Sequence, residues 1–539
     1  MNKIFAKDYY KMLTYAAKKL ADNAEKVNAL NVFPVPDGDT GSNMSMTISG
    51  VNSITSDQLS DLGTVAKAAG DLMLRSARGN SGVILSVYFR GLAAGLAELE
   101  SADAKVLVPA LASATTAAYG AVMNPTEGTI LSVMRAASEA VADFDSDDTE
   151  LLFKTAIDAA EAALEHTPEQ LPVLKEAGVV DAGGCGFMII LTAMNEVLSG
   201  KAEDYEIPEP AEAISLTAAA ACDAEIVFPY CTECIVEKTE EFSDPNAGEE
   251  LHKFLLSGIG DSLVYVEDES IIKLHIHTSH PGSVLTEAEK YGAFLTVKIE
   301  NMRKQHTELA AIPEVASLPD GVGFVAVSNG DGICDVFRDL GVNEIVSGGQ
   351  TMNPSTDDLL DAIKKVGLKT VFVLPNNSNI VLTANTTVAL AEELGINVRV
   401  IPSKSIPQGI TALYDFDPEA DIDTNEKAMI EGLSTVKSLS VTNAIRDAVI
   451  GDLTIKEGQF IGLVENKVKK AADTLYDCVD MLLDELTGCS CVIAYCGEDL
   501  GEAEAAKIKE MIDAKVGDSA DVTVLFGGQP VYSLIISGE

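Results

Sequence analysis

The first 200 residues carry apolar side chains at the three- and four-residue spacing of helices that each bury one face. The pattern begins at Tyr9 and continues through Leu13, Ala16, Ala17, Leu20, Ala24 and Val27. Similar Ala- and Leu-rich stretches occupy residues 62–99, 107–123, 131–144, 151–164 and 186–198. Four glycine clusters interrupt them: DGDTG at 37–41, RGNSG at 78–82, EGT at 127–129 and DAGGCG at 181–186. The sequence therefore predicts an all-α domain over residues 1–200 whose helices break at glycine.

The rest of the chain predicts two further domains. Residues 201–213 are acidic and contain two prolines, which is typical of an exposed connector. Residues 214–310 combine strand-like runs with one helical stretch and predict a small α+β middle domain. After a proline-punctuated segment at 311–320, strands and helices alternate, which predicts an α/β C-terminal domain over 320–539 with a mostly parallel sheet and two lobes, about 320–435 and 440–539. The middle strands are expected at 225–228, 234–237, 262–267 and 271–277, and the middle helix at 249–256; the C-terminal strands are expected at 322–327, 344–346, 370–374, 398–401, 490–495 and 521–526, and the helices at 356–365, 386–394, 467–486 and 502–514.

Composition excludes several classes of function. The 539 residues include 38 basic and 83 acidic side chains, a net charge of −45, which repels nucleic acids and anionic lipid surfaces. No stretch approaches the length of a membrane span, and the lysine-dotted start is unlike a signal peptide, so we expect no nucleic-acid partner and no direct membrane insertion. Nine irregularly spaced cysteines do not form a disulfide framework and predict a cytoplasmic location.

The motif NVFPVPDGDTGSNM at 31–44 is the strongest candidate for a metal site. Gly38 allows the chain to turn between Asp37 and Asp39, so that both carboxylates can bind one cation. Mg²⁺ takes one or two protein carboxylates and completes its shell with phosphate oxygens and water, which Asp37, Asp39 and the amide of Asn31 would suit. The alternative is an ordinary surface turn. Familiar nucleotide loops are absent: there is no GxxxxGK[ST], and Gly330 and Gly332 lack the third glycine of a dinucleotide fingerprint.

The second cluster, RGNSG, precedes an apolar helical run at 83–96. Backbone N–H groups at a helix N-terminus bind anions, so this segment is a candidate phosphate site. The alternative is that the glycines only cap helices. Four glycine breaks in one helical domain, one of them bearing paired carboxylates, favour the phosphate site.

The four segments NVFPVPDGDTGSNM, SARGNSGVIL, GTILSVMR and VVDAGGCGF, in this order, resemble the nucleotide-binding L-subunit (DhaL-like) domain of dihydroxyacetone kinases. From about residue 5 to 539 the chain is similar to the ATP-binding subunit of bacterial fatty acid kinases (FakA-type). Supporting motifs are YCTECIVE, LHIHTSHPG, VKIENMRKQH, SGGQTMNPST, LPNNSNI and IPSKSIPQG. The resemblance implies a helical barrel that holds Mg²⁺ and ATP at one end.

By this resemblance, Asp37 and Asp39 are the catalytic residues and, with Asn31, ligate Mg²⁺ that bridges the nucleotide phosphates. The dihydroxyacetone kinase pattern has three aspartates and a histidine here, whereas this chain has Asn31 and Thr40. That departure puts the third metal ligand in question. Nucleotide contacts are implied at Asn31, Asp37, Asp39, Thr40, Gly41, Asn43, Asn80, Ser81, Gly82, Thr129, Leu131, Asp181, Gly183 and Gly184.

The histidines bear on the substrate. Dihydroxyacetone kinases hold their substrate covalently through a histidine of a partner subunit, but this chain has no histidine after His306. A fatty-acid carboxylate is already ionised near pH 7 and needs no general base. Both points agree with a carboxylate substrate, and the resemblance implies phosphorylation of a fatty acid that a separate fatty-acid-binding (FakB-type) protein presents by docking on the C-terminal domain. A kinase for a small hydroxyl or keto substrate and a non-catalytic, ATP-sensing scaffold stay as alternatives, and a homodimer is implied by the resemblance alone.

A second candidate metal site lies in the middle domain. His275 and His277 lie two residues apart on a predicted strand, hence on the same face. Of Cys231 and Cys234 only one can join them, and Cys231 is favoured, giving a Cys-His-His zinc site. The alternative is a pair of ordinary half-buried histidines with free thiols; the resemblance implies zinc.

Two loops of the C-terminal domain, 347–355 and 374–379, follow predicted strands. The carboxyl ends of parallel strands are where α/β folds bind ligands. Asn and Ser are also plain turn formers, so both interpretations stay open.

Overall fold

The computed structural model describes residues 3–31, 38–122, 124–210, 230–239, 242, 248–255, 259–267, 271–301, 319–349, 353–444, 447–450, 453–517 and 520–539. Contacts divide the chain into two compact units, Met1–Ala213 with Leu318–Glu539, and Ile214–Ser317. The first unit contains a helical part and an α/β part.

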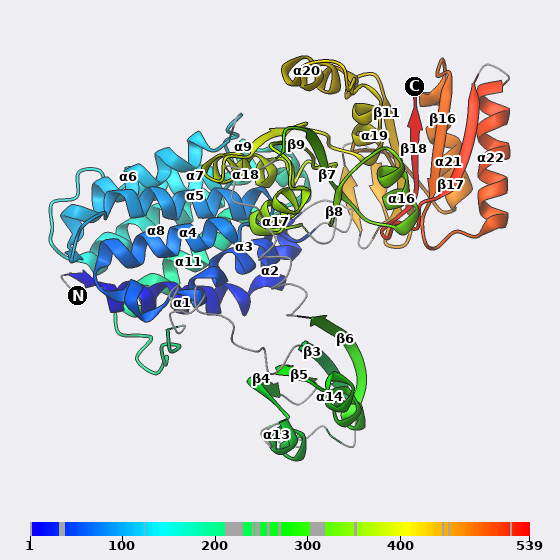
Figure 1. Ribbon diagram of the computed structural model, residues 1–539. Coiled ribbons are helices and arrows are strands. Elements are labelled where there is room, and N and C mark those ends of the chain that lie inside the picture. The colour runs from blue at the N-terminus through cyan, green and yellow to red at the C-terminus, as the bar shows by residue number, and fades with distance from the viewer. Residues whose placement is uncertain are drawn as a thin grey trace. The chain divides into compact units, whose positions relative to one another are not determined.

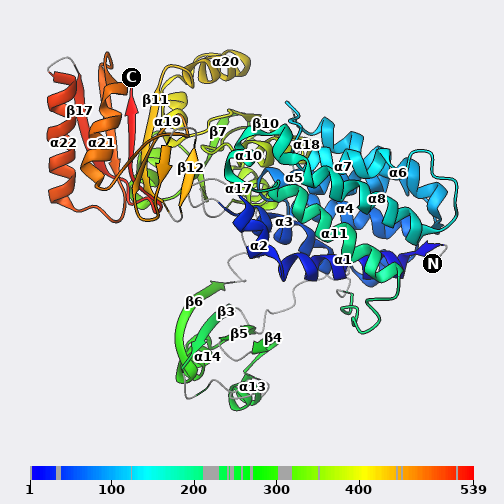
Figure 2. The ribbon, with the colours of Figure 1, turned by 180° about the vertical axis from the view of Figure 1, so that it is seen from behind.

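The helical part is a group of helices that lie alongside one another, as both views show for α1, α4, α5, α8 and α11 (Figures 1 and 2). Two strands of two residues each, β1 (Ile4–Phe5) and β2 (Ser101–Ala102), pair antiparallel and were not expected from the sequence. The helices are α1 (Ala6–Ala21), α2 (Ala24–Leu30), α3 (Thr40–Ser49), α4 (Leu62–Arg75), α5 (Gly79–Gly95), α6 (Ala104–Gly120), α7 (Ile130–Glu139), α8 (Thr149–Glu165), α9 (Thr167–Gln170), α10 (Pro172–Ala177) and α11 (Ala182–Leu198), with 3₁₀ turns at Gly50–Ser53 and Ser56–Leu59.

The apolar stripes read from the sequence form one continuous core. Leu13, Leu20 and Phe187 are fully buried in it. The rings of Tyr88 and Phe187 meet edge to face, with centroids 5.0 Å apart. The predicted helical N-terminal part is confirmed.

The first lobe of the α/β part is a four-stranded parallel sheet in the order β10-β9-β7-β8. One face packs against α16, α19 and α20 through residues such as Phe337, Leu413 and Met429. Helices α17 and α18 contact the strands β7, β8 and β10. The elements are β7 (Val322–Ser328), α16 (Asp331–Asp339), β8 (Glu344–Ser347), α17 (Thr356–Val366), β9 (Thr370–Leu374), α18 (Val381–Glu393), β10 (Asn397–Val400), α19 (Ile406–Tyr414) and α20 (Ile422–Gly432).

The second lobe is a six-stranded mixed sheet in the order β15-β14-β11-β18-β16-β17. Alternate residues of its strands serve two cores: Ala494 and Ile536 pack with α21 and α22, whereas Tyr495 and Ile535 join the core of the first lobe. The core of the first lobe is therefore built from residues of both lobes. The elements are β11 (Lys437–Asn443), β12 (Ala448–Ile450), β13 (Leu453–Ile455), β14 (Phe460–Val464), β15 (Lys467–Ala472), α21 (Leu475–Leu483), a 3₁₀ turn at Asp484–Leu486, β16 (Cys491–Cys496), α22 (Glu502–Val516), β17 (Asp521–Phe526) and β18 (Tyr532–Gly538).

The predicted α/β C-terminal part is confirmed, with two corrections. The helix expected at 467–486 is wrong over its first residues, because Lys467–Ala472 is the strand β15, paired antiparallel with β14. Thr474 then caps α21 by accepting the N–H of Asp477, which places the helix start at Leu475. The prediction of a mostly parallel sheet is correct only for the first lobe, since most strand pairs of the second lobe are antiparallel.

The second unit is an antiparallel sheet in the order β4-β5-β3-β6 with two helices. Its core is formed by alternate strand residues such as Cys234, Leu274 and Ile276 together with Leu251 of α13 and Val284 of α14. The strand expected at 225–228 lies outside the described residues. The elements are β3 (Tyr230–Lys238), α13 (Glu249–Leu255), β4 (Gly260–Glu267), β5 (Ile271–Thr278), α14 (Pro281–Ala288), a 3₁₀ turn at Glu289–Tyr291 and β6 (Gly292–Asn301).

In the described parts of the chain, the helices are all too short or too polar to span a lipid bilayer.

The ring of Phe187 should be a main support of the helical part. Phe187→Ala should lower its free energy of unfolding by about 3–5 kcal/mol, because it leaves a cavity beside Tyr88. Phe5→Ala, at a ring that is 53% exposed, should cost less than about 0.5 kcal/mol. Urea unfolding followed by far-ultraviolet circular dichroism would measure both, and equal costs would contradict the assigned core.

Candidate functional site

Each of the four glycine clusters lies at the start of a helix or immediately before it. DGDTG leads into α3, RGNSG contains the first residues of α5, EGT precedes α7, and DAGGCG opens α11. The sequence prediction that the helices break at these clusters therefore agrees with the structure at all four points.

The starts of α5, α7 and α11 open onto one pocket of about 1150 Å³. A methyl group on Gly183 of α11 would lie 3.5 Å from the Ser81 hydroxyl oxygen and 3.2 Å from Cβ of Ile130, so the three helix ends are close together. The predicted residues that line this pocket are Asn80, Ser81, Thr129, Leu131 and Asp181.

Two of the three helices that begin at the pocket, α5 and α7, lack the N-cap side-chain hydrogen bond that α11 has. Helices α4, α6 and α8 are capped by the side chains of Asp61, Asp103 and Asp148. By contrast, α3, α5 and α7 have no N-cap side-chain hydrogen bond within the described structure. In α3 the N–H of Ser42 is accepted by the side chain of Asn28, and in α7 the N–H of Ile130 is accepted by the carboxylate of Asp181. At the start of α5 no side chain of the described residues caps the helix, and N–H groups with the positive end of a helix dipole suit a phosphate.

The predicted metal-binding segment is described only in part. Asp37 lies outside the described residues. Asp39 is the N-cap residue of α3, and its carbonyl accepts the N–H of the buried Asn43. Asn31, at the end of α2, donates its side-chain N–H to the hydroxyl of Thr40 at 3.2 Å. Asn31, Asp39 and Thr40 thus lie close together in space as well as in sequence.

Two glycines are required by the geometry around this segment. A Cβ on Gly41 would lie 2.2 Å from the carbonyl oxygen of Ala24, so only glycine lets α3 approach α2 this closely. Gly79 has a φ of +59°, in the left-handed region, and a Cβ there would meet the side-chain amide of Asn43 at 2.7 Å. These contacts place the start of α5 against α3 and hence near Asp39.

Asp181 is the predicted site residue whose titration is most strongly perturbed among those described. It caps α11 by accepting the N–H of Gly184 at 2.7 Å. Desolvation raises the pKa of Asp181 to about 6, although the backbone N–H groups of Gly184, Ile130 and Gly183 act in the opposite direction. The Asp181 carboxylate therefore takes the N-terminal capping position of α11, which an anionic ligand could otherwise occupy.

Residues of the α/β part that sequence reasoning did not assign to this site reach it directly. Asn353 donates its side-chain N–H to Oδ2 of Asp39 at 2.6 Å, and its carbonyl accepts from Arg78 Nη1 at 2.7 Å. The side chain of Asn80 donates to Asn379 at 3.4 Å. The lysines that line the pocket, Lys404 and Lys437, also belong to the α/β part. The sequence did offer one signal for these residues. Asn353 and Asn379 lie in the two loops that were predicted to follow strands, where α/β folds bind ligands.

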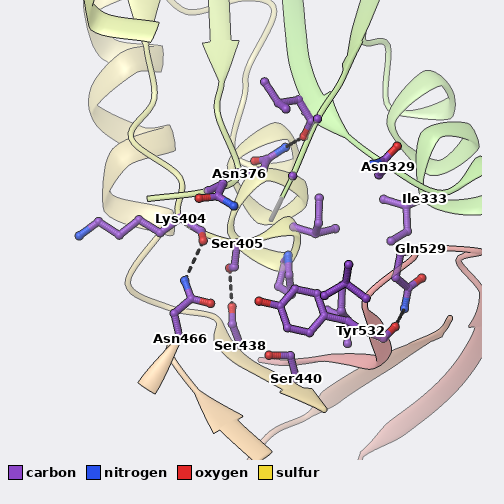
Figure 3. Close-up of a pocket in the computed structure, with 18 of the residues that line it drawn as sticks. Asn329, Ile333, Asn376, Lys404, Ser405, Ser438, Ser440, Asn466, Gln529 and Tyr532 are labelled. Atoms are coloured by element: carbon purple, nitrogen blue, oxygen red, sulfur yellow. Dashed lines mark hydrogen bonds between the residues drawn. The ribbon is translucent and has the colours of Figure 1, made fainter. Parts of the chain in front are cut away.

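Those two loops also line a smaller pocket between the lobes of the α/β part, with a volume of about 80 Å³ (Figure 3). Ser405 and Ser438 join across it by a 2.7 Å hydrogen bond, and Asn466 donates to the carbonyl of Lys404 at 2.8 Å. Figure 3 shows the ring of Tyr532 beside the serine pair. Polar side chains from both lobes therefore meet at this pocket.

The predicted zinc site falls on side chains that the structure does not describe. The described side chains include no group of three or more His, Cys, Asp or Glu placed to hold a metal, but those of Cys231, His275 and His277 lie outside that set. The backbone register of β3 and β5 pairs Cys231 directly with His277. Cys234, the alternative ligand, is buried in the apolar core of the unit.

Comparison with known proteins identifies relatives over the whole chain. Family models match as a DAK2 domain over residues 34–196, and as the FakA-like middle and C-terminal domains of fatty acid kinases over residues 227–309 and 323–539. Protein YloV of Bacillus subtilis is 38% identical over 558 residues, covering 98% of each chain. A Staphylococcus saprophyticus protein is 35% identical and covers 100% of both chains. The resemblance read from the motifs is confirmed.

Likeness to solved structures is weaker. A Thermotoga maritima protein, described as revealing a fatty acid binding function, is 13% identical with a TM-score of 0.31, covering 41% of this chain and 99% of its own. The dihydroxyacetone kinase of C. freundii is 23% identical with a TM-score of 0.28, covering 35% of this chain and 34% of its own. Neither likeness carries an argument about function.

The raised pKa of Asp181 makes a testable contribution to stability. Because its folded-state pKa of about 6 lies above the ordinary value of 3.8, the folded chain binds its proton more tightly, and stability is lost as pH rises from about 4 to 6. Asp181→Asn keeps a capping oxygen but cannot titrate. Between pH 4 and pH 7, the free energy of unfolding of the variant should therefore rise relative to that of the wild type by up to about 3 kcal/mol. Urea unfolding of nucleotide-free protein at both pH values would measure this gain, and a pH-independent difference would contradict it.

Proposed function

Because this chain belongs to the FakA-like family of fatty acid kinase proteins, we propose that it transfers the γ-phosphoryl group of ATP to the carboxylate of a fatty acid. A separate fatty-acid-binding protein presents that substrate, and the product is an acyl phosphate. The observation that carries the proposal is the meeting of three helix N-termini at one pocket, where α5 has no side-chain cap among the described residues.

The proposed reaction requires no side chain that transfers a proton. A carboxylate oxygen of the fatty acid attacks the γ-phosphorus as the bond to the bridging oxygen of ADP breaks, and no proton is transferred. A general base is unnecessary because the nucleophile is ionised near pH 7. This agrees with the lack of any histidine before His166, which is exposed and lies 3.2 Å from Glu169. Positioning and charge neutralisation then supply the catalysis.

The residues present fit a magnesium ion. Asp39, Asn31 and Thr40, with the predicted Asp37, offer the hard oxygen ligands that Mg²⁺ prefers. The buried side-chain oxygen of Asn353, the residue that contacts Asp39, has no hydrogen-bond partner among the described residues, which leaves an acceptor for a metal-bound water. When bound there, Mg²⁺ would neutralise charge on the phosphates.

Delivery of the lipid by a second protein is what the family resemblance implies. We therefore assign lipid binding to the partner and its docking to the α/β part. The barrel arrangement of the helices, a homodimer through the middle unit and a cytoplasmic location are further proposals that come from the family resemblance and the cysteine pattern.

Removing the paired carboxylates tests the proposal. The double variant Asp37→Ala with Asp39→Ala should lose at least about 100-fold in acyl phosphate formation, since metal coordination contributes several kcal/mol to phosphoryl transfer. Its circular dichroism spectrum should match the wild type. The assay contains ATP, Mg²⁺ and a lipid-loaded partner protein and detects acyl hydroxamate.

Two parallel assays separate the alternatives. Formation of ADP from ATP and dihydroxyacetone without any partner would favour a small-molecule kinase. Nucleotide binding without turnover under any partner would favour a sensing scaffold. Full activity of the double variant would refute the proposed site.

Zinc bound by Cys231, His275 and His277 is our proposal for the middle unit, supported by the register that pairs Cys231 with His277. Metal analysis of the purified chain should find about one zinc per chain, and the double variant His275→Ala with His277→Ala should contain none. His166→Ala, at an exposed histidine of the other unit, is the control. An equal zinc content in all three proteins would exclude these ligands.

A further inference from the structure

A residue of the α/β part lies against the predicted metal carboxylate, 314 positions away in the sequence. Asn353 precedes α17 and is only 1% exposed. Its side-chain nitrogen donates to Oδ2 of Asp39 at 2.6 Å. This contact joins the two parts of the first unit at the point where the helical part is expected to bind its cation.

Further contacts fix Asn353 in this position. Arg78, the N-cap residue of α5, donates to the carbonyl of Asn353 at 2.7 Å and lies 3.2 Å from the carboxylate of Asp358. The backbone N–H of Thr356 donates to the carbonyl of Ala77 at 3.2 Å. The start of α5, our candidate phosphate site, is therefore held by the α/β part as well.

The other end of the Asn353 amide is unsatisfied. Its side-chain oxygen is buried and has no hydrogen-bond partner among the described residues. Buried polar atoms normally have a partner, so an orphaned acceptor next to a carboxylate points to a missing donor. Water bound to a metal ion is such a donor. The nitrogen of the same amide orients Asp39, as outer-shell groups commonly orient metal-binding carboxylates.

We propose that Asn353 is a positioning residue of the metal–nucleotide site, and that binding of Mg²⁺ with nucleotide and docking of the α/β part onto the helical part strengthen each other. The inference rests on only one step of the proposed function, the binding of the nucleotide. Reciprocity follows from linkage: whatever docking adds to the affinity for the metal–nucleotide complex, that complex adds to docking.

The first test is nucleotide affinity of the full-length protein, measured by calorimetry with ADP in Mg²⁺ and with ADP in EDTA. Asn353→Ala should weaken binding of ADP in Mg²⁺ by about 10-fold, the lower range for loss of an outer-shell partner. It should leave binding in EDTA unchanged, a selectivity that a merely structural role would not produce.

Two further variants serve as controls for this test. Asn353→Leu keeps the volume of the side chain without its polar atoms, so it should lose the same affinity even where the smaller alanine loosens the fold. Asn397→Ala, at an exposed asparagine of the same part, should match the wild type.

The second test follows docking itself by hydrogen–deuterium exchange. In the wild type, Mg²⁺ with ADP should slow exchange in peptides that contain Thr356, because its N–H donates to the carbonyl of Ala77 and so joins the two parts. In Asn353→Ala this slowing should be absent.

The outcomes are distinct. Equal affinity and equal slowing in the variant and the wild type would overturn the inference and leave the proposed function standing. Tighter binding by the variant would show that Asn353 competes with the metal, which also overturns it. A wild type that binds no ADP in Mg²⁺ would remove both proposals, whereas normal binding without acyl phosphate formation would remove the proposed function alone.

Discussion

The backbone N–H groups at the starts of α5 and α7 are the interaction on which this site depends. A helix leaves its first N–H groups without internal partners, and proteins usually satisfy them with a side chain. The helical part does so with aspartates at α4, α6 and α8. At α5 no described side chain takes that place, and at α7 the N–H of Ile130 reaches the carboxylate of Asp181. An anionic ligand is the acceptor that we propose there, and the glycines that open α5 and α11 let these helix ends pack closely against neighbouring side chains.

Charge balance explains why a phosphate site in so acidic a chain needs contributions from several elements. The chain carries a net charge of −45, and the arginine at the start of α5, Arg78, is occupied by Asn353 and Asp358. In the proposed site, the charge of a phosphate would therefore be met by helix ends, by a divalent cation at Asp39 and by the pocket lysines of the α/β part. The raised pKa of Asp181 shows how strongly burial disfavours uncompensated negative charge in this region. Because these groups come from both parts, the proposed site is complete only where the helical and α/β parts lie together.

Local signals in the sequence were enough to predict much of the fold. The three- and four-residue spacing predicted the helices, and the strand β9 (Thr370–Leu374) was predicted to the residue because five consecutive apolar or β-branched side chains fill a buried parallel strand. The error at Lys467–Ala472 has the same origin: its lysines and alanines favour helix, and only pairing with β14 makes it a strand. Long-range contacts leave no such signal. Thr129 looks like a helix cap, yet its hydroxyl donates to the carbonyl of Thr126 instead, and nothing near Asn353 in the sequence links it to Asp39.

The arrangement of the two parts also bears on how the proposed phosphoryl transfer to a fatty acid would be kept from becoming hydrolysis of ATP. Water is a competing nucleophile wherever a γ-phosphate is activated, so the activating groups should come together only when the site is covered. Here the helical part contributes the carboxylate and the helix ends, while the α/β part contributes Asn353, the lysines and the proposed surface for the lipid carrier. Neither part holds the full set. In the proposed reaction, a division of this kind would make activation of the phosphate conditional on contact between the two parts.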